Sequence, residues 1–357
     1  MAALHSCRAG ARTLLIEKNS KPGIPVQCGE FMPAADELTL MFPEAPHIND
    51  LLEIPLTCVS NKTSVMRVLT PAERGYNIPF NGVILERGLL EQTILAAAVD
   101  NGLELQCGTT AKSVNGSTIE TNRGAFEATV VIGADGPQSI VARDNGSPPL
   151  QNTAFGIQYL VESDRISDDV VELYFGPVAQ GGYGWVIPKG NGLFNIGVGV
   201  RNRRPNSVIG KEVLDPFMEV IRRRSGGSMK VVSTTAGLIP VAGPLKTTAF
   251  KNTLLVGDAG GQLMSCNGGG IPTSMICGRI AGQTAAEYAL NGAPLSVYEQ
   301  RWRTQIGKEL ARGVATRHVF DILTMSKITT EIAMRIAGNS GMRKLVMCKP
   351  WYTAWPD

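Results

Sequence analysis

The sequence is poor in the features that mark several common classes of function. Its 357 residues include three histidines, and its seven cysteines form no Cys-x-x-Cys pair and no zinc spacing. We therefore predict no metal site and a set of free thiols, as a reducing cytoplasm maintains. No apolar run approaches the roughly 20 residues that cross a bilayer, and the first residues lack a signal-peptide core. We predict a cytoplasmic protein that contacts a membrane at most peripherally.

The bulk composition excludes further classes. A net charge of +3 is too small to indicate a nucleic-acid partner. With 43% apolar and 18% charged residues the chain is typical of a folded protein, and it is long enough for two domains. Glycine is in surplus, at 40 residues. Because glycine lets the backbone approach a ligand closely, clusters of it at strand ends favour a nucleotide-binding protein.

The beginning of the chain also lacks a glycine loop. MAALHSCRAGARTLLIEKN predicts a helix over 1–10, a stop at Gly10 and a strand over 12–17. In a dinucleotide-binding unit, a first strand and a glycine loop precede such a helix, and the acid follows the loop by about 20 residues. Since 16 residues precede Glu17, we expect Met1 to be an internal methionine of a longer protein. The neighbours of the absent strand should then be unpaired.

The rest of the chain predicts an α/β protein whose nucleotide-binding domain is split in sequence. A helix is expected over 89–101, and alternating strands begin near Thr153, where KGNG marks a hairpin. Helices then dominate from Gly270 to the end. We predict a Rossmann-like domain, an inserted antiparallel β-sheet domain and a C-terminal helical region. Their segments are 1–57, 80–150 and 245–295 for the first, 151–244 for the second and 296–357 for the third.

Two fragments supply candidate ligand contacts at strand ends. Glu17 ends the strand TLLIE, where a carboxylate can accept hydrogen bonds from both hydroxyls of an adenosine ribose. In VVIGADGPQS, Asp135 can fix the turn and reach a ligand hydroxyl, and Gly136 allows close approach. The alternatives are a solvated acid at Glu17 and an ordinary strand-to-helix turn at Asp135.

The third fragment, NTLLVGDAGGQLMSCNGGGIPTSMICGRIAG, is the strongest. Its strand delivers Gly257 and Asp258 to the sheet edge, where Asp258 could hold a polyol chain. Gly268, Gly269 and Gly270 then open a helix at Ile271, whose free N–H groups stabilise negative charge. The N1 and C2 carbonyl edge of a reduced flavin carries such charge. This fragment predicts FAD, which the chain as given should hold poorly without its glycine loop.

Together, these fragments resemble the FAD-dependent oxidoreductases of the aromatic hydroxylase type, and more narrowly the archaeal geranylgeranyl reductases. The narrower resemblance rests on IPVQCGE, GGYGWVIPKGNGLFNIGVGV and GGGIPTSMICGRIAG. It extends in order over nearly the whole chain. Two positions depart from the family pattern. Ile187 replaces a usual Phe, and Ser265 and Cys266 stand where a proline is common, which suggests a looser loop.

The resemblance implies which residues lie at the reaction centre. It places Cys28 and Gly29 beside the flavin ring, and Tyr183, Trp185 and Ile187 along a substrate cavity. Because these last three are spaced by two, they share one face of a strand. That face could line an apolar tunnel for a prenyl chain, or it could simply be core.

The implied reaction is saturation of carbon–carbon double bonds in a geranylgeranyl chain carried on a diphosphate or an ether lipid. Reduced flavin supplies hydride, and a proton must also be added. None of His5, His47 and His318 fits this role. Cys28 is the candidate, as a proton donor or as a thiol that exchanges electrons with Cys266. Its alternative role is packing against the ring.

Other functions remain open at this point. A flavin monooxygenase or hydroxylase shares the Gly-Asp fragments, and a truncated chain without activity of its own is a third reading. Since there is no second glycine fingerprint, the electron donor could be ferredoxin, a deazaflavin or NAD(P)H. From Glu299 onward ten Lys or Arg stand against five Asp or Glu, and the tail KPWYTAWPD is aromatic. These features suit an anionic lipid surface, or a solvated helical face.

Overall fold

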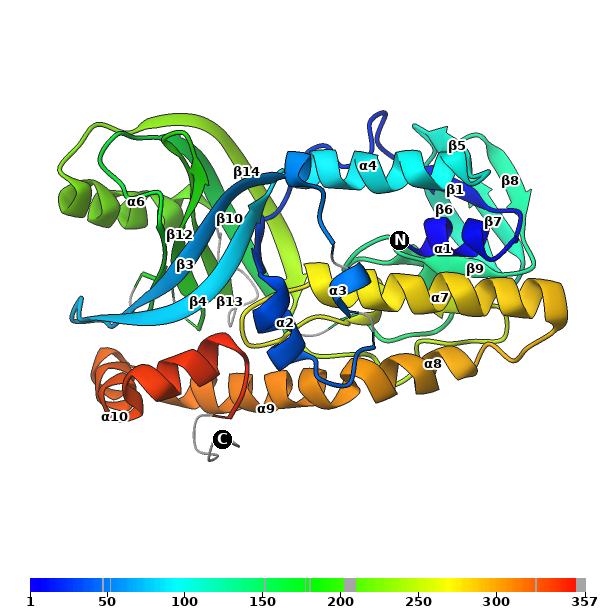
Figure 1. The fold of residues 1–357 in the computed structure, drawn as a ribbon. Coiled ribbons are helices and arrows are strands. Elements are labelled where there is room, and N and C mark those ends of the chain that lie inside the picture. Colours follow the sequence, from blue (N-terminus) through cyan, green and yellow to red (C-terminus); the bar gives the residue numbers. More distant parts are fainter. Residues whose placement is uncertain are drawn as a thin grey trace.

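The computed structural model describes residues 1–46, 48–51, 53–150, 152–176, 178–179, 181–201, 210–324 and 326–350. His47 and the aromatic tail 351–357 lie outside them. Figure 1 shows two β-rich lobes joined by long helices. One lobe is built on a large curled sheet, and the other on short parallel strand pairs. The helices are α1 (Ala2–Arg8), α2 (Ala35–Met41), α3 (Ile48–Leu51), α4 (Arg87–Asp100), α5 (Ile140–Asp144), α6 (Lys211–Ser225), α7 (Ile271–Asn291), α8 (Val297–Trp302), α9 (Lys308–Leu323) and α10 (Lys327–Val346).

The large sheet has eight strands among the described residues. In spatial order they are β14 (Lys230–Pro240), β10 (Thr153–Glu162), β13 (Leu193–Arg201), β12 (Tyr183–Gly190), β11 (Val170–Tyr174), β3 (Val59–Leu69), β4 (Gly75–Leu85) and β2 (Phe31–Pro33). All neighbours run antiparallel except β11 and β3, which are parallel. The expected antiparallel sheet over 151–244 is therefore present, but it also takes in three strands from earlier in the chain. The start of the predicted 80–150 segment, through Leu85, belongs to this sheet. The domain boundaries themselves remain a prediction.

The KGNG hairpin forms as predicted. Asn191 and Gly192 connect β12 to β13, with φ of 55° and 74°. Positive φ at both central residues is the geometry of the turn that matches the twist of paired strands. This turn sets which side chains of β12 face the other lobe.

The second lobe contains the predicted parallel strands. β1 (Leu14–Glu17) pairs with β5 (Glu104–Cys107), and β15 (Thr253–Leu255) pairs with β9 (Val131–Gly133), both in parallel. No strand of the described residues joins the two pairs, so each of these four strands has one unpaired edge. A small antiparallel sheet of β6 (Ala111–Asn115), β7 (Thr118–Thr121) and β8 (Gly124–Glu127) covers this lobe.

The predicted helices at the beginning of the chain are confirmed. α1 ends before Gly10, whose φ is 88°, and α4 corresponds to the helix expected over 89–101. α1 packs closely on α7 because Gly282 lacks a side chain. A Cβ at that position would lie 2.2 Å from the carbonyl oxygen of Ala2.

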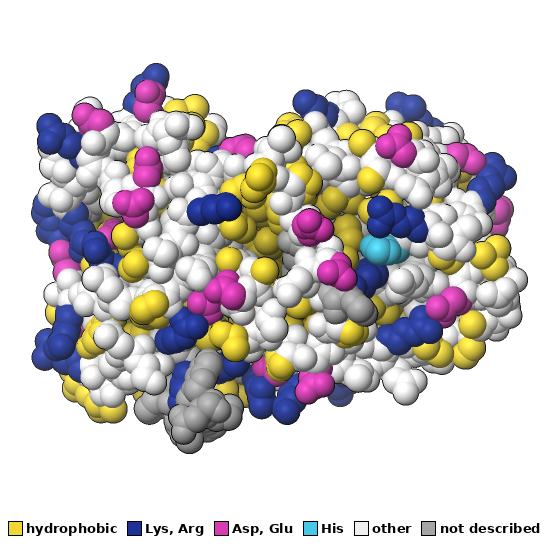
Figure 2. Space-filling model, in the orientation of Figure 1, with side chains coloured by type: hydrophobic (Ala, Val, Ile, Leu, Met, Phe, Trp, Pro, Cys, Tyr) yellow, Lys and Arg dark blue, Asp and Glu magenta, His cyan; other side chains and the backbone are white. Residues whose placement is uncertain are grey.

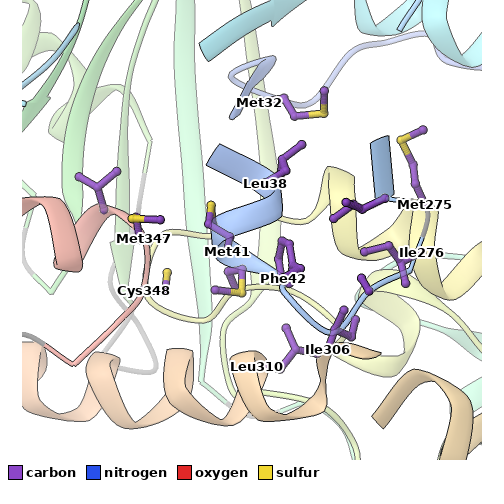
Figure 3. Packing of buried hydrophobic residues seen from close by; sticks show 14 of the residues in the cluster. Met32, Leu38, Met41, Phe42, Met275, Ile276, Ile306, Leu310, Met347 and Cys348 are labelled. Atoms are coloured by element: carbon purple, nitrogen blue, oxygen red, sulfur yellow. The ribbon is translucent and has the colours of Figure 1, made fainter. Parts of the chain in front are cut away.

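The two lobes share one hydrophobic core. Residues of β3, β4 and β12 belong to the same buried cluster as residues of α2, α7, α9 and α10. Figure 3 shows part of it, where Met41, the last residue of α2, and the following Phe42 lie near Ile276 of α7 and Leu310 of α9. The core therefore fixes the flank of the large sheet against the beginning of α7. No helix of the described chain is long and apolar enough to cross a membrane.

Candidate functional site

The loop before α7 has the geometry of an anion-binding site. α7 begins at Ile271 with Gly270 as its N-cap, and no side chain caps it. Pro272 stands in the first turn, where its missing N–H costs nothing. The uncapped N–H groups and the positive dipole end of this 21-residue helix favour a negatively charged ligand. Within the triple glycine only Gly268 needs the left-handed region, with φ of 72°.

Asp258 lies beside this helix end. A Cβ on Gly270 would be 3.5 Å from its Oδ1 atom. Burial raises the pKa of the Asp258 carboxyl above its usual value, and the nearby Arg87 cation offsets part of this rise. Among the described residues, no donor hydrogen-bonds to this carboxylate. A half-buried carboxylate of this kind fits the hydroxyls of a polyol chain, as the sequence predicts.

The Cys28 loop meets α4 at Arg87. The amide of Glu30 donates to the Cys28 sulfur at 3.2 Å, and the Arg87 guanidinium lies near this sulfur. Arg87 pairs with Glu91 as well, at 2.7 Å. Burial lowers the pKa of Arg87, but Cys28 and Glu91 outweigh it and raise the pKa overall. One cation thus lies near both Cys28 and Asp258, two of the predicted site residues.

Glu30 anchors this loop to the large sheet. It is buried, with a left-handed φ of 65° that is uncommon for a residue with a side chain. Its Oε2 accepts from Lys189 Nζ at 2.5 Å and from Asn195 Nδ2 at 3.2 Å, and its Oε1 accepts from the Arg87 amide at 3.0 Å. Such strain persists only where the surroundings enforce it, and it concentrates at functional sites.

The sheet also holds the backbone of the loop. Gln158 Nε2 of β10 donates to the Cys28 carbonyl at 2.8 Å, and Asn195 Nδ2 of β13 donates to the Gly29 carbonyl at 3.2 Å. Gln158 Oε1 accepts in turn from Trp185 Nε1 at 3.3 Å. The position of Cys28 is therefore determined by side chains of three adjacent strands.

Tyr183, Trp185 and Ile187 share the face of β12 that turns toward the Cys28 loop and the triple-glycine loop. The rings of Tyr183 and Trp185 meet edge to face at 5.9 Å. The Tyr183 hydroxyl donates to the Asn267 carbonyl, and Ile187 packs against Gly29. Burial raises the pKa of Tyr183, and Cys348, Cys266 and Cys28 nearby raise it further. The shared face is confirmed, while a tunnel for substrate stays a prediction.

Three glycines of the large sheet leave space for the side chain of Trp185. Its indole lies across Gly156 of β10 and Gly197 and Gly199 of β13, and a Cβ on Gly197 would be 2.4 Å from it. Gly197 and Gly199 are part of the segment FNIGVGV, and Gly156 belongs to β10. They leave room for a flat aromatic side chain on the surface of the sheet.

Glu17 and Asp135 lie in the other lobe, at the carboxyl ends of β1 and β9 (Figure 1). Glu17 accepts from the Asn19 amide at 2.8 Å. Asp135 accepts from the Ser139 hydroxyl and from the amides of Ile140 and Val141, so it caps α5. Gly136 follows it in the left-handed region, with φ of 86°. The fixing of the turn by Asp135 is confirmed, and both of its oxygens are engaged.

The structure thus brings together Cys28, Gly29, Asp258, the triple glycine and the β12 face. Asp135 and Gly136 follow β9, the strand that pairs with β15 ahead of Asp258, and Glu17 ends β1 in the other strand pair of the second lobe. Figure 2 shows hydrophobic side chains gathered in a hollow between the lobes, with acidic and basic side chains at its rim. A two-part site of this form, with an uncapped helix end and an unbonded carboxylate, fits an elongated dinucleotide. Sequence reasoning missed Glu30, Arg87, Lys189 and Asn195. The Glu of Cys-Gly-Glu was the available signal for the first of these.

Comparisons with known proteins agree with this geometry. A family model described as the geranylgeranyl reductase catalytic domain matches residues 152–239. The chain is 33% identical to digeranylgeranylglycerophospholipid reductase 2 of Methanothermobacter thermautotrophicus, over 90% of this chain and 84% of that protein. It is 30% identical to digeranylgeranylglycerophospholipid reductase of Methanothrix thermoacetophila, over 98% and 93%.

Solved structures agree on the fold. A geranylgeranyl bacteriochlorophyll reductase-like protein from Thermoplasma acidophilum superimposes with a TM-score of 0.79 at 22% identity, covering 94% of this chain and 87% of that one. A flavin-dependent brominase superimposes with a TM-score of 0.69 at 14% identity, over 97% and 88%. These two likenesses concern the fold alone.

Proposed function

The chain belongs to the geranylgeranyl reductase family of oxidoreductases, and on this premise we propose that it saturates carbon–carbon double bonds of a geranylgeranyl chain with FAD as cofactor. The substrate class is an isoprenoid lipid, either geranylgeranyl diphosphate or a digeranylgeranylglycerophospholipid, in membrane lipid synthesis. The observation that carries the proposal is the meeting of the Cys28 loop, the aromatic face of β12 and the uncapped end of α7. Its relatives are named as reductases of such lipids.

Each part of the site has a role in this proposal. When bound, FAD supplies the hydride that the alkene accepts. The first turn of α7 stabilises the negative charge of the cofactor, Asp258 binds its polyol chain, and Glu17 binds its ribose. Tyr183, Trp185 and Ile187 hold the prenyl chain and exclude water.

Saturation also requires a proton. Cys28 is the proposed donor, because its sulfur lies in the loop that the sheet fixes. The Glu30 amide orients this sulfur. The Cys28→Ser variant tests the assignment, since an unchanged turnover and pH profile would contradict it.

A product analysis tests the whole proposal. The chain is incubated anaerobically with FAD, dithionite and either lipid, and the lipid is examined by mass spectrometry. We expect a gain of two hydrogen atoms per reduced bond, and no gain would contradict the proposal. Consumption of NADPH coupled to oxygen, with a hydroxylated product, would favour a monooxygenase instead. Replacing dithionite by ferredoxin, a reduced deazaflavin or NAD(P)H identifies the donor.

The C-terminal helices support peripheral contact with an anionic lipid surface. Ile328, Ile332 and Ile336 follow one another along the outer face of α10 and are 71%, 53% and 72% exposed. Exposed apolar side chains in a row are unusual on a helix that faces water, and basic residues outnumber acidic ones in this part of the chain. The tail that contributed to this prediction lies outside the described residues.

Co-sedimentation with vesicles tests this contact. At low salt we expect binding to vesicles that contain anionic phospholipid, and weaker binding when Ile332 and Ile336 are both replaced by Ser. Leu290→Ser is the matched control, because Leu290 is 55% exposed on α7. Absence of binding at low salt, or an equal loss in the control, would contradict the proposal.

A further inference from the structure

The end of the described chain lies against the loop that precedes α7. Asn267 Nδ2 donates to the Val346 carbonyl at 3.1 Å, and the Cys266 sulfur approaches the Leu345 carbonyl at 4.0 Å. The Tyr183 hydroxyl reaches the same loop at Asn267. α10 ends here at Val346, and we call residues 345–349, its last two residues and the three that follow, the C-terminal turn. These contacts bring two segments about 80 positions apart in the chain side by side.

Each of these segments carries a cysteine, and the two cysteines meet at one carbonyl. The amide of Cys348 donates to the Leu345 carbonyl at 3.0 Å, and the Cys266 sulfur approaches the same oxygen at 4.0 Å. Cys348 is 1% exposed, while Cys266 is partly exposed. Burial, and then the neighbouring Cys266, raise the pKa of the Cys348 thiol well above its usual value.

The backbone at Cys348 adds a second observation. Its φ is 54°, in the region that residues with side chains rarely adopt, and its carbonyl accepts from Thr316 Oγ1 at 3.4 Å. At this residue the chain turns beside the loop that carries Cys266. Left-handed residues of this kind persist where the surroundings enforce them.

Cys28 has different partners. Its sulfur accepts from the Glu30 amide and lies near Arg87 of α4. The sequence suggests electron exchange between Cys28 and Cys266, whereas in the structure the Cys266 sulfur lies beside the turn that carries Cys348.

We propose that Cys266 and Cys348 form a reversible disulfide that fastens the C-terminal turn onto the loop before α7. The oxidant is a small-molecule disulfide of the glutathione class. Because Cys266 is the accessible thiol, its thiolate attacks one sulfur of this disulfide and releases one thiol. Cys348 then attacks the Cys266 sulfur and releases the second thiol. Two protein thiols are oxidised to one disulfide, and one small disulfide is reduced to two thiols.

The consequence is that redox conditions determine how tightly the loop before α7 is held. In the oxidised chain, the loop that carries Asn267 and the triple glycine is tied covalently to the end of α10. In the reduced chain, hydrogen bonds alone connect them. The pairing does not depend on the reaction proposed above, so either can fail without the other.

Peptide mapping of the full chain tests the pairing. The chain is equilibrated with oxidised and reduced glutathione in defined ratios, trapped with an alkylating reagent and digested. We expect a linked peptide that contains Cys266 and Cys348 and disappears on reduction. Hydrogen exchange at 345–349 should slow on the order of tenfold in the oxidised chain.

Matched variants decide the outcome. Cys266→Ser and Cys348→Ser should each abolish the link, whereas Cys107→Ser, at another partly exposed cysteine, should leave it intact. Circular dichroism confirms that each variant is folded, and Cys266→Ala provides a second substitution. A mixed glutathione adduct on Cys266 without the link, or a link from Cys266 to Cys28, would overturn the proposal.

Discussion

At the scale of single residues, Glu30 connects the Cys28 loop to three other elements of the fold. It is a buried carboxylate in a left-handed conformation, and it accepts hydrogen bonds from α4, β12 and β13. A buried charge is costly unless it is paired, so its removal leaves a second charge unpaired. The Cys28 loop therefore depends on Glu30 for its position.

Replacing Glu30 by Gln should destabilise the chain. We expect a loss of about 3 kcal/mol, the lower end for a broken buried pair, because Lys189 also contacts Glu86 at 3.2 Å. Urea unfolding followed by circular dichroism measures it. Combining Glu30→Gln with Lys189→Met should recover part of the loss, and Glu120→Gln, at an exposed site, should change little. A loss no larger than in this control would contradict the role of Glu30.

Gly197 gives a second prediction at this scale. An added methyl group would overlap the Trp185 indole, so Gly197→Ala should cost roughly 1–3 kcal/mol by overpacking. Gly75→Ala is the matched control, since a Cβ there lies at an ordinary 3.5 Å from Arg67. Unfolding midpoints in urea compare the two. Equal midpoints would show that the indole is free to move away.

At the scale of elements, the packing of α1 on α7 determines how the beginning of the chain responds to pH. Burial, and then the neighbouring Arg8, lower the pKa of His5 from 6.5 to about 4. His5 lies in α1, and Gly282 lets this helix approach α7 closely. The docked helix thus disfavours a charged imidazole.

This arrangement predicts a loss of stability in acid. Between pH 6.5 and about 4 the unfolded chain binds a proton at His5 that the folded chain does not. The free energy of unfolding should therefore fall as the pH decreases through this window. Urea unfolding at pH 7 and pH 5 measures the difference, which should be smaller in His5→Gln. An identical pH dependence in this variant would rule out His5 as the source.

Elements also show what local sequence patterns can predict. Hydrophobic periodicity and turn residues predict α1, α4, the β12–β13 hairpin and the strand before Gly257, because each depends on neighbours in the chain. The capping of α5 by Asp135 also depends on neighbours in the chain, because Ser139 and Ile140 follow within five residues. By contrast, β3 and β4 enter the large sheet through pairing with β11, which no local pattern specifies.

At the scale of the whole molecule, one hydrophobic cluster spans the two lobes, so we expect them to unfold as one cooperative unit. Leu310 of α9 is fully buried in the cluster that also contains residues of α2, α7 and the sheet. Leu310→Ala should cost roughly 2–5 kcal/mol through lost contacts and a cavity.

The same variant tests cooperativity. We expect a single unfolding transition at a lower urea concentration, with helix and strand signals in circular dichroism changing together. Ile322→Ala, at a position of α9 that is 67% exposed, is the control and should change the midpoint little. Two separated transitions would contradict a common core.

In the candidate site, likewise, some features depend on residues that are close in sequence and others on residues that are far apart. The motif residues Cys28, Trp185 and Gly268 could be predicted from sequence, and the structure gathers them. The bond between Lys189 and Glu30 joins positions 159 residues apart, so no window of sequence contains both. Such pairs follow only from the three-dimensional fold.

The placement of Trp185 allows its fluorescence to report binding of a flavin. Its indole packs against three glycines of the large sheet and donates a hydrogen bond to Gln158. It lies beside the loop where a flavin ring is proposed to lie. Flavins absorb where tryptophan emits, so a flavin bound there would quench the fluorescence of Trp185 by energy transfer. In a background in which Trp302, Trp351 and Trp355 are all replaced by Phe, Trp185 is the remaining tryptophan, and a titration with FAD would report occupancy of the site without any turnover.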